Sequence, residues 1–289
     1  MPLVLLWNPP PWSPAPGPHE GCEITHDRSR LPAAAAVVFH VPTLPALLRL
    51  PKPAGQAWVA WSMESEALYP PLADPGYLRA FDLTMTYRFD SDVPVPYFEP
   101  GLPAALATPP ARKVEPSPAV LFISNAEERS GRTEYARELM RHLAVDSFGR
   151  CLNNRRLEED RGRATRQEVI RGYRFTLAFE NSIATDYVTE KFFDPLAAGS
   201  VPVYLGAPNV ADLAPGEDCY LDVRDFAGPA ELAAHLTALA ADEEAYDGLL
   251  AWKRRPLRAG FVHRFDACSR SPFDRLAERL SVLQQGASR

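Results

Sequence analysis

The chain has 289 residues, 46% hydrophobic and 24% charged, which is enough to bury the core of one large or two compact domains. A formal net charge of −6 argues against a nucleic-acid-coating protein. No segment approaches the roughly 20 apolar residues that span a bilayer. The apolar start at residues 1–7 is also too short for a signal peptide. We therefore expect a soluble protein of a reducing cytoplasm.

The few cysteines and lysines of the chain indicate which kinds of site to expect. The cysteines Cys22, Cys151, Cys219 and Cys268 form no C-x-x-C pair, so buried free thiols are expected rather than a zinc site. Arginine carries most of the positive charge and lysine is rare, a bias typical of a GC-rich, bacterial genome. This scarcity draws attention to Lys191.

The first half of the chain alternates short apolar segments with loops. β-branched and aromatic residues predict strands over residues 3–7, 36–41, 56–62 and 83–87. A short helix is expected over residues 43–50. This βαβ-like order is typical of an α/β domain.

A proline-dense segment follows at residues 100–118, where we expect a stiff connector without regular structure. The domain boundary is placed there. The predicted organisation is an N-terminal domain over residues 1–100, a linker over 101–118 and a C-terminal domain with a helical tail over 119–289.

The second half returns to the α/β order. Strands are predicted over residues 119–124, 174–179 and 201–205, and helices over 133–144 and 188–198. Residues 229–285 look largely helical, with breaks at Pro256 and Pro272. The fold class is therefore α/β, with two Rossmann-like domains facing a cleft. The tail is expected to pack in a core, and peripheral contact with the inner membrane face stays open beside it.

The most informative segment runs from Phe175 to Gly206 and is predicted to be strand, polar loop, helix and strand. Glu180 and Asn181 follow the first strand, where ligands of parallel sheets bind. Lys191 lies in the first turn of the helix, whose free N–H groups and dipole favour an anion. An ordinary solvated helix start, capped by Thr189 or Asp186 and with Glu190 and Lys191 in water, is the alternative.

This segment resembles the signature of the α1,3/α1,4-fucosyltransferases, glycosyltransferase family 10. The matching motifs are Phe-Glu-Asn-Ser at 179–182, Asp-Tyr-x-Thr-Glu-Lys at 186–191 and Ala-Gly-x-Val-Pro-Val at 198–203. The resemblance implies a soluble, bacterial-type member with the two-domain GT-B fold. It also implies that the C-terminal domain binds GDP-fucose and that fucose is transferred with inversion.

The resemblance extends over about residues 20–225 and has departures. The family's Glu-Ser-Pro is Glu64-Ser65-Glu66 here, its second arginine before Asp-Ser-Asp is Phe89, and Ala126 replaces a cysteine. These departures lie on the acceptor side or at structural positions. They leave the identity of the acceptor open.

The resemblance also suggests roles for individual residues. Glu64 is the expected general base, which takes the proton of the acceptor hydroxyl. Arg132 and Lys191 are expected to stabilise the leaving diphosphate. The remaining predicted donor contacts are Glu180, Glu190, Asn181 and Tyr187, with the two glutamates accepting hydrogen bonds from sugar hydroxyls.

No metal is expected to be required, although modest stimulation by Mn²⁺ or Mg²⁺ is compatible with this reading. The triplet Asp90-Ser91-Asp92 matches the Asp-x-Asp metal motif of other glycosyltransferases, but it lies in the first half and is expected to be structural.

The expected reaction moves L-fucose from GDP-β-L-fucose to a hydroxyl of an oligosaccharide or glycoconjugate, O3 of N-acetylglucosamine or glucose in the family's usual α1,3 linkage. The alternatives are a transferase for another nucleotide sugar, or a non-catalytic glycan- or nucleotide-binding protein. No nucleic acid partner is expected.

Overall fold

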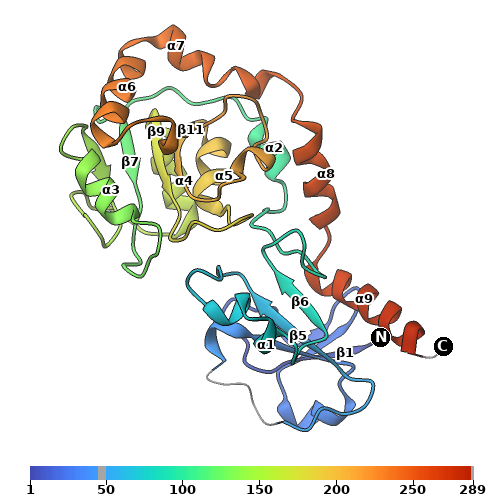
Figure 1. Ribbon diagram of the computed structural model, residues 1–289. Helices are drawn as coiled ribbons and strands as arrows, with labels where there is room; N and C mark the ends of the chain where they lie inside the picture. Colours follow the sequence, from blue (N-terminus) through green and yellow to red (C-terminus); the bar gives the residue numbers. More distant parts are fainter. Residues whose placement is uncertain (45–49, 288–289) are drawn as a thin grey trace. The chain divides into compact units, whose positions relative to one another are not determined.

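The computed structural model describes residues 1–44 and 50–287 (Figure 1). It divides into two compact units, residues 1–96 together with 266–289, and residues 97–265. Each unit is built on its own mainly parallel sheet, as the alternating sequence pattern predicts. The second unit is continuous in sequence, whereas the first takes its last element from the end of the chain.

The first unit contains a six-stranded sheet in the order β2-β3-β1-β4-β5-β6. All neighbouring strands are parallel except the short edge pair β2 and β3. The strands are β1 (Leu3–Leu6), β2 (Gly17–Pro18), β3 (Glu23–Thr25), β4 (Ala36–His40), β5 (Ala57–Ser62) and β6 (Leu83–Thr86). A short helix, α1 (Pro75–Leu78), follows β5.

The second unit contains a five-stranded sheet, parallel throughout, in the order β11-β10-β9-β7-β8. Its strands are β7 (Ala119–Leu121), β8 (Val145–Ser147), β9 (Phe175–Phe179), β10 (Val201–Leu205) and β11 (Leu221–Asp222). Its helices are α2 (Leu102–Leu106), α3 (Arg132–Leu139), α4 (Arg163–Arg171), α5 (Glu190–Ala198), α6 (Pro229–Ala241) and α7 (Glu243–Gly248). The helix α8 (Ala259–Cys268) leads out of this unit.

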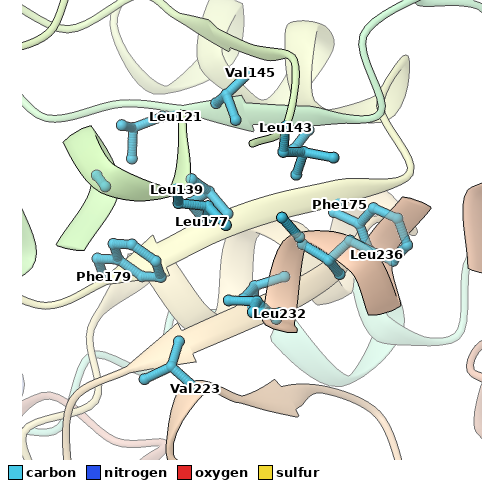
Figure 2. Close-up of a cluster of buried hydrophobic side chains, with 14 of the residues drawn as sticks. Leu121, Leu139, Leu143, Val145, Phe175, Leu177, Phe179, Val223, Leu232 and Leu236 are labelled. Carbon is cyan, nitrogen blue, oxygen red and sulfur yellow. The ribbon is translucent and has the colours of Figure 1, made fainter. Parts of the chain in front are cut away.

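The core of the second unit lies between the sheet and helices α3 and α6. Figure 2 shows Leu139 of α3 and Leu232 and Leu236 of α6 packed over strand residues such as Leu177. These side chains recur at helical spacing on α6 and at alternate positions on the strands, so each element turns one apolar face to the other. This packing holds the central strand β9 and therefore the loop that follows it.

The last helix, α9 (Pro272–Ala287), belongs to the first unit. Phe273, Leu276 and Leu280 are buried with Val59 and Met85 of the sheet. The sequence placed this tail with the second half, because periodicity reveals the apolar face of a helix but not the sheet that covers it. Core packing, rather than an exposed apolar stripe, accounts for Leu276 and Leu280.

Several predicted elements are confirmed. The strand over 201–205 is observed with the predicted bounds, and the other predicted strands differ by one to three residues at their ends. The helix predicted over 133–144 ends at Leu139. The helix expected over residues 43–50 falls largely outside the described residues.

One expectation about local structure needs correction, and one helix was missed. The proline-rich segment, expected to lack regular structure, contains the helix α2. Pro103 is the second residue of this helix, where a proline has no helical hydrogen bond to lose. The sequence also did not predict α4, because its residues are mostly polar and only a few are apolar.

The four cysteines are free, and Cys22 and Cys219 are buried as expected.

Candidate donor site at the start of helix α5

The polar loop between β9 and α5 is held at the carboxyl edge of the second sheet. Glu180 follows β9 directly, and its backbone N–H donates to the carbonyl of Leu205 on β10 at 2.8 Å. The hydroxyl of Ser130 donates to the Glu180 carbonyl at 2.6 Å. These bonds fix Glu180 at the end of the strand, where ligands of parallel sheets bind.

The carboxylate of Glu180 is completely buried and bound by Thr189. Oε1 accepts from the Thr189 backbone N–H at 2.7 Å, and Oε2 accepts from its hydroxyl at 2.8 Å. Burial raises the pKa of Glu180 above its ordinary value, while Lys191 and the two Thr189 donors oppose this rise. In this geometry Glu180 positions the start of α5, and its contact with a donor hydroxyl stays a prediction.

Thr189 is the N-cap of α5, one of the two caps that the sequence left open. Its hydroxyl oxygen accepts from the backbone N–H of Lys191 at 3.3 Å and from Lys191 Nζ at 3.0 Å. One hydroxyl has a single proton and two lone pairs, so these three bonds use its full capacity. Thr189 therefore joins the end of β9 to the first turn of α5.

Lys191 is the charged centre of this cluster. Its Nζ lies 3.1 Å from Oε1 of Glu190 and 3.6 Å from Oε2 of Glu180. Burial lowers the pKa of Lys191, but the two carboxylates outweigh this effect and raise it above its ordinary value, so the ammonium stays charged. The side chain is 26% exposed. A solvent-reachable cation at the N-terminus of a helix suits an anionic group.

Arg166 of α4 lies near Glu190 and was not predicted from the sequence as a site residue. Burial raises the pKa of Glu190, but Lys191 and Arg166 of α4 outweigh it, so the pKa falls below its ordinary value. Arg166 also lies 3.5 Å from Oδ2 of buried Asp194. A cavity of about 40 Å³ is lined in part by these four charged residues. The buried carboxylate on the apolar helix was the available signal, because it requires a cationic partner.

Arg132 is buried and bound to backbone carbonyls. It is only 2% exposed, and its Nη1 and Nη2 donate to the carbonyls of Phe179 and Asn125 at 3.1 and 2.9 Å. Burial lowers the pKa of its guanidinium, and Glu180 partly offsets this. In this conformation Arg132 holds the end of β9 against the loop at Asn125. Its binding to a diphosphate stays a prediction.

Asn181 and Tyr187 also lie in this loop, and both are buried. The Asn181 carbonyl accepts from the backbone N–H of Arg129 at 2.7 Å. The Tyr187 ring packs edge-on against Tyr97 with centroids 6.0 Å apart. The structure thus brings all the predicted donor-side residues to one loop region, although Asn181 and Tyr187 are largely covered.

Gly206 follows β10 and faces the same cluster. A Cβ at this position would lie 2.6 Å from Cγ of Glu180 and still closer to the Tyr204 hydroxyl. The Tyr204 hydroxyl accepts from Ala207 N at 2.9 Å and lies 3.3 Å from the Tyr187 carbonyl. Only glycine leaves room for Glu180 here.

Glu64, the predicted base, belongs to the first unit and follows β5. The Ser62 hydroxyl accepts from the Glu64 backbone N–H at 3.0 Å and donates to its carbonyl at 2.9 Å. The neighbouring Glu66 accepts a hydrogen bond from the Tyr87 hydroxyl and lies 3.7 Å from Arg88. The loop is therefore fixed at the carboxyl edge of this sheet.

Asp90 and Asp92 are each engaged within the first unit. Asp90 accepts from Nε and Nη2 of Arg88 at 2.8 and 2.7 Å. Asp92 accepts from the N–H and hydroxyl of Thr84 at 2.8 and 3.0 Å and pairs with Arg279 at 3.2 Å. Among residues 1–44 and 50–287, no group of three or more His, Cys, Asp or Glu side chains is arranged to hold a metal ion.

Two α/β units with parallel sheets, each with polar loops at the carboxyl edges of its strands, define the GT-B class of fold. Solved structures agree. The crystal structure of an α1,3-fucosyltransferase with GDP-fucose matches with a TM-score of 0.59 and 17% identity, over 86% of this chain and 81% of that one. A second, with GDP, matches with a TM-score of 0.53 and 17% identity, over 79% and 72%. At this identity the likeness shows the fold.

The sequence comparisons are more specific. The model "Glycosyltransferase family 10 (fucosyltransferase) C-term" matches residues 112–282, and "Fucosyltransferase, N-terminal" matches residues 1–98. The chain therefore belongs to glycosyltransferase family 10, the fucosyltransferases.

Curated relatives support this membership. Alpha-(1,3)-fucosyltransferase 7 of Bos taurus is 40% identical over 264 residues, which cover 87% of this chain and 73% of the bovine protein. GDP-fucose protein O-fucosyltransferase 3 of Xenopus laevis is 31% identical over 281 residues, covering 86% and 58%. A fucosyltransferase-like protein of Arabidopsis thaliana is 40% identical over 195 residues, covering 66% and 37%. The chain thus spans between 37% and 73% of the length of these three relatives.

Within the part of the chain that the structure describes, no helix is long and apolar enough to cross a membrane.

Proposed function

We propose that the chain transfers L-fucose from GDP-β-L-fucose to a hydroxyl of an acceptor glycan, with inversion at the fucose anomeric carbon. The observation that carries this proposal is the Glu180–Thr189–Lys191 cluster. It places a charged ammonium at the N-terminus of α5, inside the segment that matches the family's C-terminal model. Its chemistry suits the diphosphate of a nucleotide sugar.

Inversion requires the acceptor oxygen to attack from the face opposite the departing GDP. Two groups on this chain are proposed to assist. Glu64 accepts the proton of the attacking hydroxyl as general base. Lys191, with the N–H groups of the α5 N-terminus, stabilises the negative charge that grows on the leaving diphosphate. Because Lys191 supplies a fixed positive charge, no divalent ion is required for this step.

A pocket in the first unit is the proposed acceptor subsite. It has a volume of about 360 Å³ and lies beside the segments that follow β5 and β6. Leu72 and Leu78 form an apolar part of its wall. The polar groups come from Glu66, Tyr87 and Arg88. An apolar surface with a few directional polar groups suits a sugar ring. The proposed acceptor is N-acetylglucosamine or glucose with a free O3.

The proposal is tested first on the donor. GDP and GDP-fucose should raise the thermal unfolding temperature, because a ligand that binds only the folded state stabilises it. UDP should leave it unchanged. Equal stabilisation by UDP and GDP would contradict the donor assignment.

The acceptor is tested by incubating the protein with GDP-fucose and a panel of glycans, followed by linkage analysis of the product. GDP release with a product fucosylated at O3 is expected. Because one relative is named a protein O-fucosyltransferase, the panel includes serine- and threonine-containing peptides. Transfer to a peptide alone would retain the donor and overturn the glycan acceptor.

A further inference from the structure

A second charged pocket lies in the second unit, away from the start of α5 that carries Lys191. It has a volume of about 630 Å³ and is formed by the segment around Pro110, the start of β9, helix α7 and the turn at 251–254. Five basic side chains line it against the two carboxylates of Glu243 and Asp247. The basic residues are Arg112, Lys113, Arg174, Lys253 and Arg254. This wall therefore has an excess of positive charge.

Much of the hydrogen-bonding capacity of this wall is unused. Arg112 and Arg254 are exposed, and neither guanidinium has a hydrogen-bond or ion-pair partner among the described residues. Arg174 donates through Nη2 to Glu243 at 2.7 Å, but its buried Nη1 has no partner in the described part of the chain. A buried donor without an acceptor is destabilising. Arg174 also lines the pocket, beside Arg112 and Arg254.

The two lysines that line the pocket are held by hydrogen bonds from their ammonium groups to backbone carbonyls. Lys113 Nζ donates to the carbonyls of Arg171 and Gly199 at 3.1 and 2.6 Å. Lys253 Nζ donates to those of Leu106 and Leu196 at 2.7 and 2.8 Å. An ammonium has three donors, so each lysine keeps one N–H beyond these two bonds.

Both lysines have a pKa below the ordinary value, mainly because they are buried. Burial lowers the pKa of Lys113 to about 8, and the neighbouring cations Arg174 and Lys253 add to this effect. Burial likewise lowers the pKa of Lys253 to about 8. A bound anion would offset the repulsion among Lys113, Arg174 and Lys253 and would raise the pKa of Lys113.

The pocket is distinct from the proposed donor site. Arg174 precedes β9 and Glu180 follows it, so the two residues stand at opposite ends of one strand. At about 3.3 Å per residue, their Cα atoms are separated by about 20 Å. One ligand phosphate cannot reach both sites.

We propose that this pocket, at the amino edge of the second sheet, binds a phosphate group through Arg112, Arg174 and Arg254. Guanidinium groups bind phosphate oxygens in pairs, and three of them around one cavity suit a phosphate group better than a carboxylate. The phosphate belongs either to a soluble phosphorylated molecule or to the headgroup of an anionic lipid. Both have the same chemistry at the pocket.

The four lysines of the chain, Lys52, Lys113, Lys191 and Lys253, make the test specific. An amine-reactive reagent is applied at pH 8 with and without inorganic phosphate, and each lysine is quantified by mass spectrometry. Phosphate should slow the modification of Lys113 several-fold, since a bound anion keeps the ammonium protonated. Lys52, paired with Asp82 in the first unit, is the internal control and should not respond.

The double variant Arg112→Gln/Arg254→Gln should abolish the protection of Lys113. These arginines are exposed, so their loss leaves the fold intact. The matched control Arg137→Gln/Arg255→Gln removes the same charge outside the pocket and should retain protection. Binding of phosphate is measured in parallel by the line width of its ³¹P resonance. The proposal is overturned if neither inorganic phosphate nor phosphatidylglycerol vesicles protect Lys113 of the wild-type protein, or if both variants behave alike.

Vesicles distinguish the two sources of the phosphate. Phosphatidylglycerol vesicles that protect Lys113 where free phosphate does not would assign the pocket to a lipid headgroup. Protection by free phosphate, with phosphatidylglycerol no more effective than phosphatidylcholine, would assign it to a soluble ligand. The assay reads Lys113 and not fucose transfer, so its outcome is independent of the proposed function.

Discussion

Glu180 and Thr189 are joined by two hydrogen bonds, one to each carboxylate oxygen of Glu180. The pair closes the loop between the central strand of the second sheet and helix α5. Because the Thr189 hydroxyl also accepts from Lys191, a change in this pair alters the position of the charge proposed to meet the diphosphate.

Replacing Thr189 with valine should destabilise the protein. The Thr189→Val variant keeps the shape of the side chain but leaves Oε2 of buried Glu180 without its donor, at a cost of about 1–3 kcal/mol. The free energy of unfolding, measured by urea titration, should fall by this amount. Thr189→Ser restores the hydroxyl and should recover most of the loss. A valine variant as stable as the wild type would show that the bond contributes nothing.

Removing the charge of Lys191 should weaken GDP binding. A hydrogen bond to a charged group is worth about 1.5–3 kcal/mol, so Lys191→Ala should lower GDP affinity by roughly 10- to 100-fold, measured by calorimetry. Lys52→Ala removes an exposed lysine of the first unit and serves as the matched control. Equal GDP affinity in both variants would remove Lys191 from the donor site.

Glu64→Gln should separate turnover from donor binding. Loss of a general base typically costs about 10²–10⁴-fold in rate, while GDP affinity should stay near the wild-type value. Glu66→Gln is the control two residues away. Since Glu66 contacts Tyr87 and Arg88 in the proposed acceptor pocket, it should raise the KM for the acceptor more than it lowers kcat. Wild-type turnover by Glu64→Gln would transfer the base role to another carboxylate.

Chelation should leave the transferase reaction intact. If Lys191 and the α5 N-terminus provide the positive charge, initial rates in EDTA should stay within a small factor of those without it. A modest increase with Mn²⁺ is compatible with this. Complete loss of activity, restored by a divalent ion, would instead implicate Asp90 and Asp92 as ligands and require Arg88 and Thr84 to release them.

Leu276→Ala should destabilise the first unit. Leu276 is fully buried, and such truncations cost about 2–5 kcal/mol in free energy of unfolding. Leu283, on the same helix, is 42% exposed, and Leu283→Ala should change stability by no more than about 0.5 kcal/mol. Similar losses in both variants would mean that α9 does not pack as described.

Secondary structure is predicted best from the sequence where apolar runs are bounded by glycines or polar residues. The strand Val201–Leu205 lies between two glycines and consists of apolar residues, so both its type and its bounds are recovered. The loop between β9 and α5 lies where the sequence predicts it for the same reason, since its polar residues follow a buried strand and precede a helix. Helix α4 was missed because Arg163 and Arg166 are paired with acids distant in sequence, Glu99 and Asp194. The burial of Arg132 and Glu180 depends on similarly long-range contacts.

The placement of α9 in the core of the first unit affects the order in which the protein can fold during synthesis. A ribosome releases β1 to β6 first, but their apolar face stays uncovered until Phe273, Leu276 and Leu280 have been translated. The second unit is made in between and has all its own core residues available before then. The second unit is therefore the first that can fold completely. Until α9 is made, the sheet of the first unit exposes an apolar face, and a chaperone would be needed during this interval.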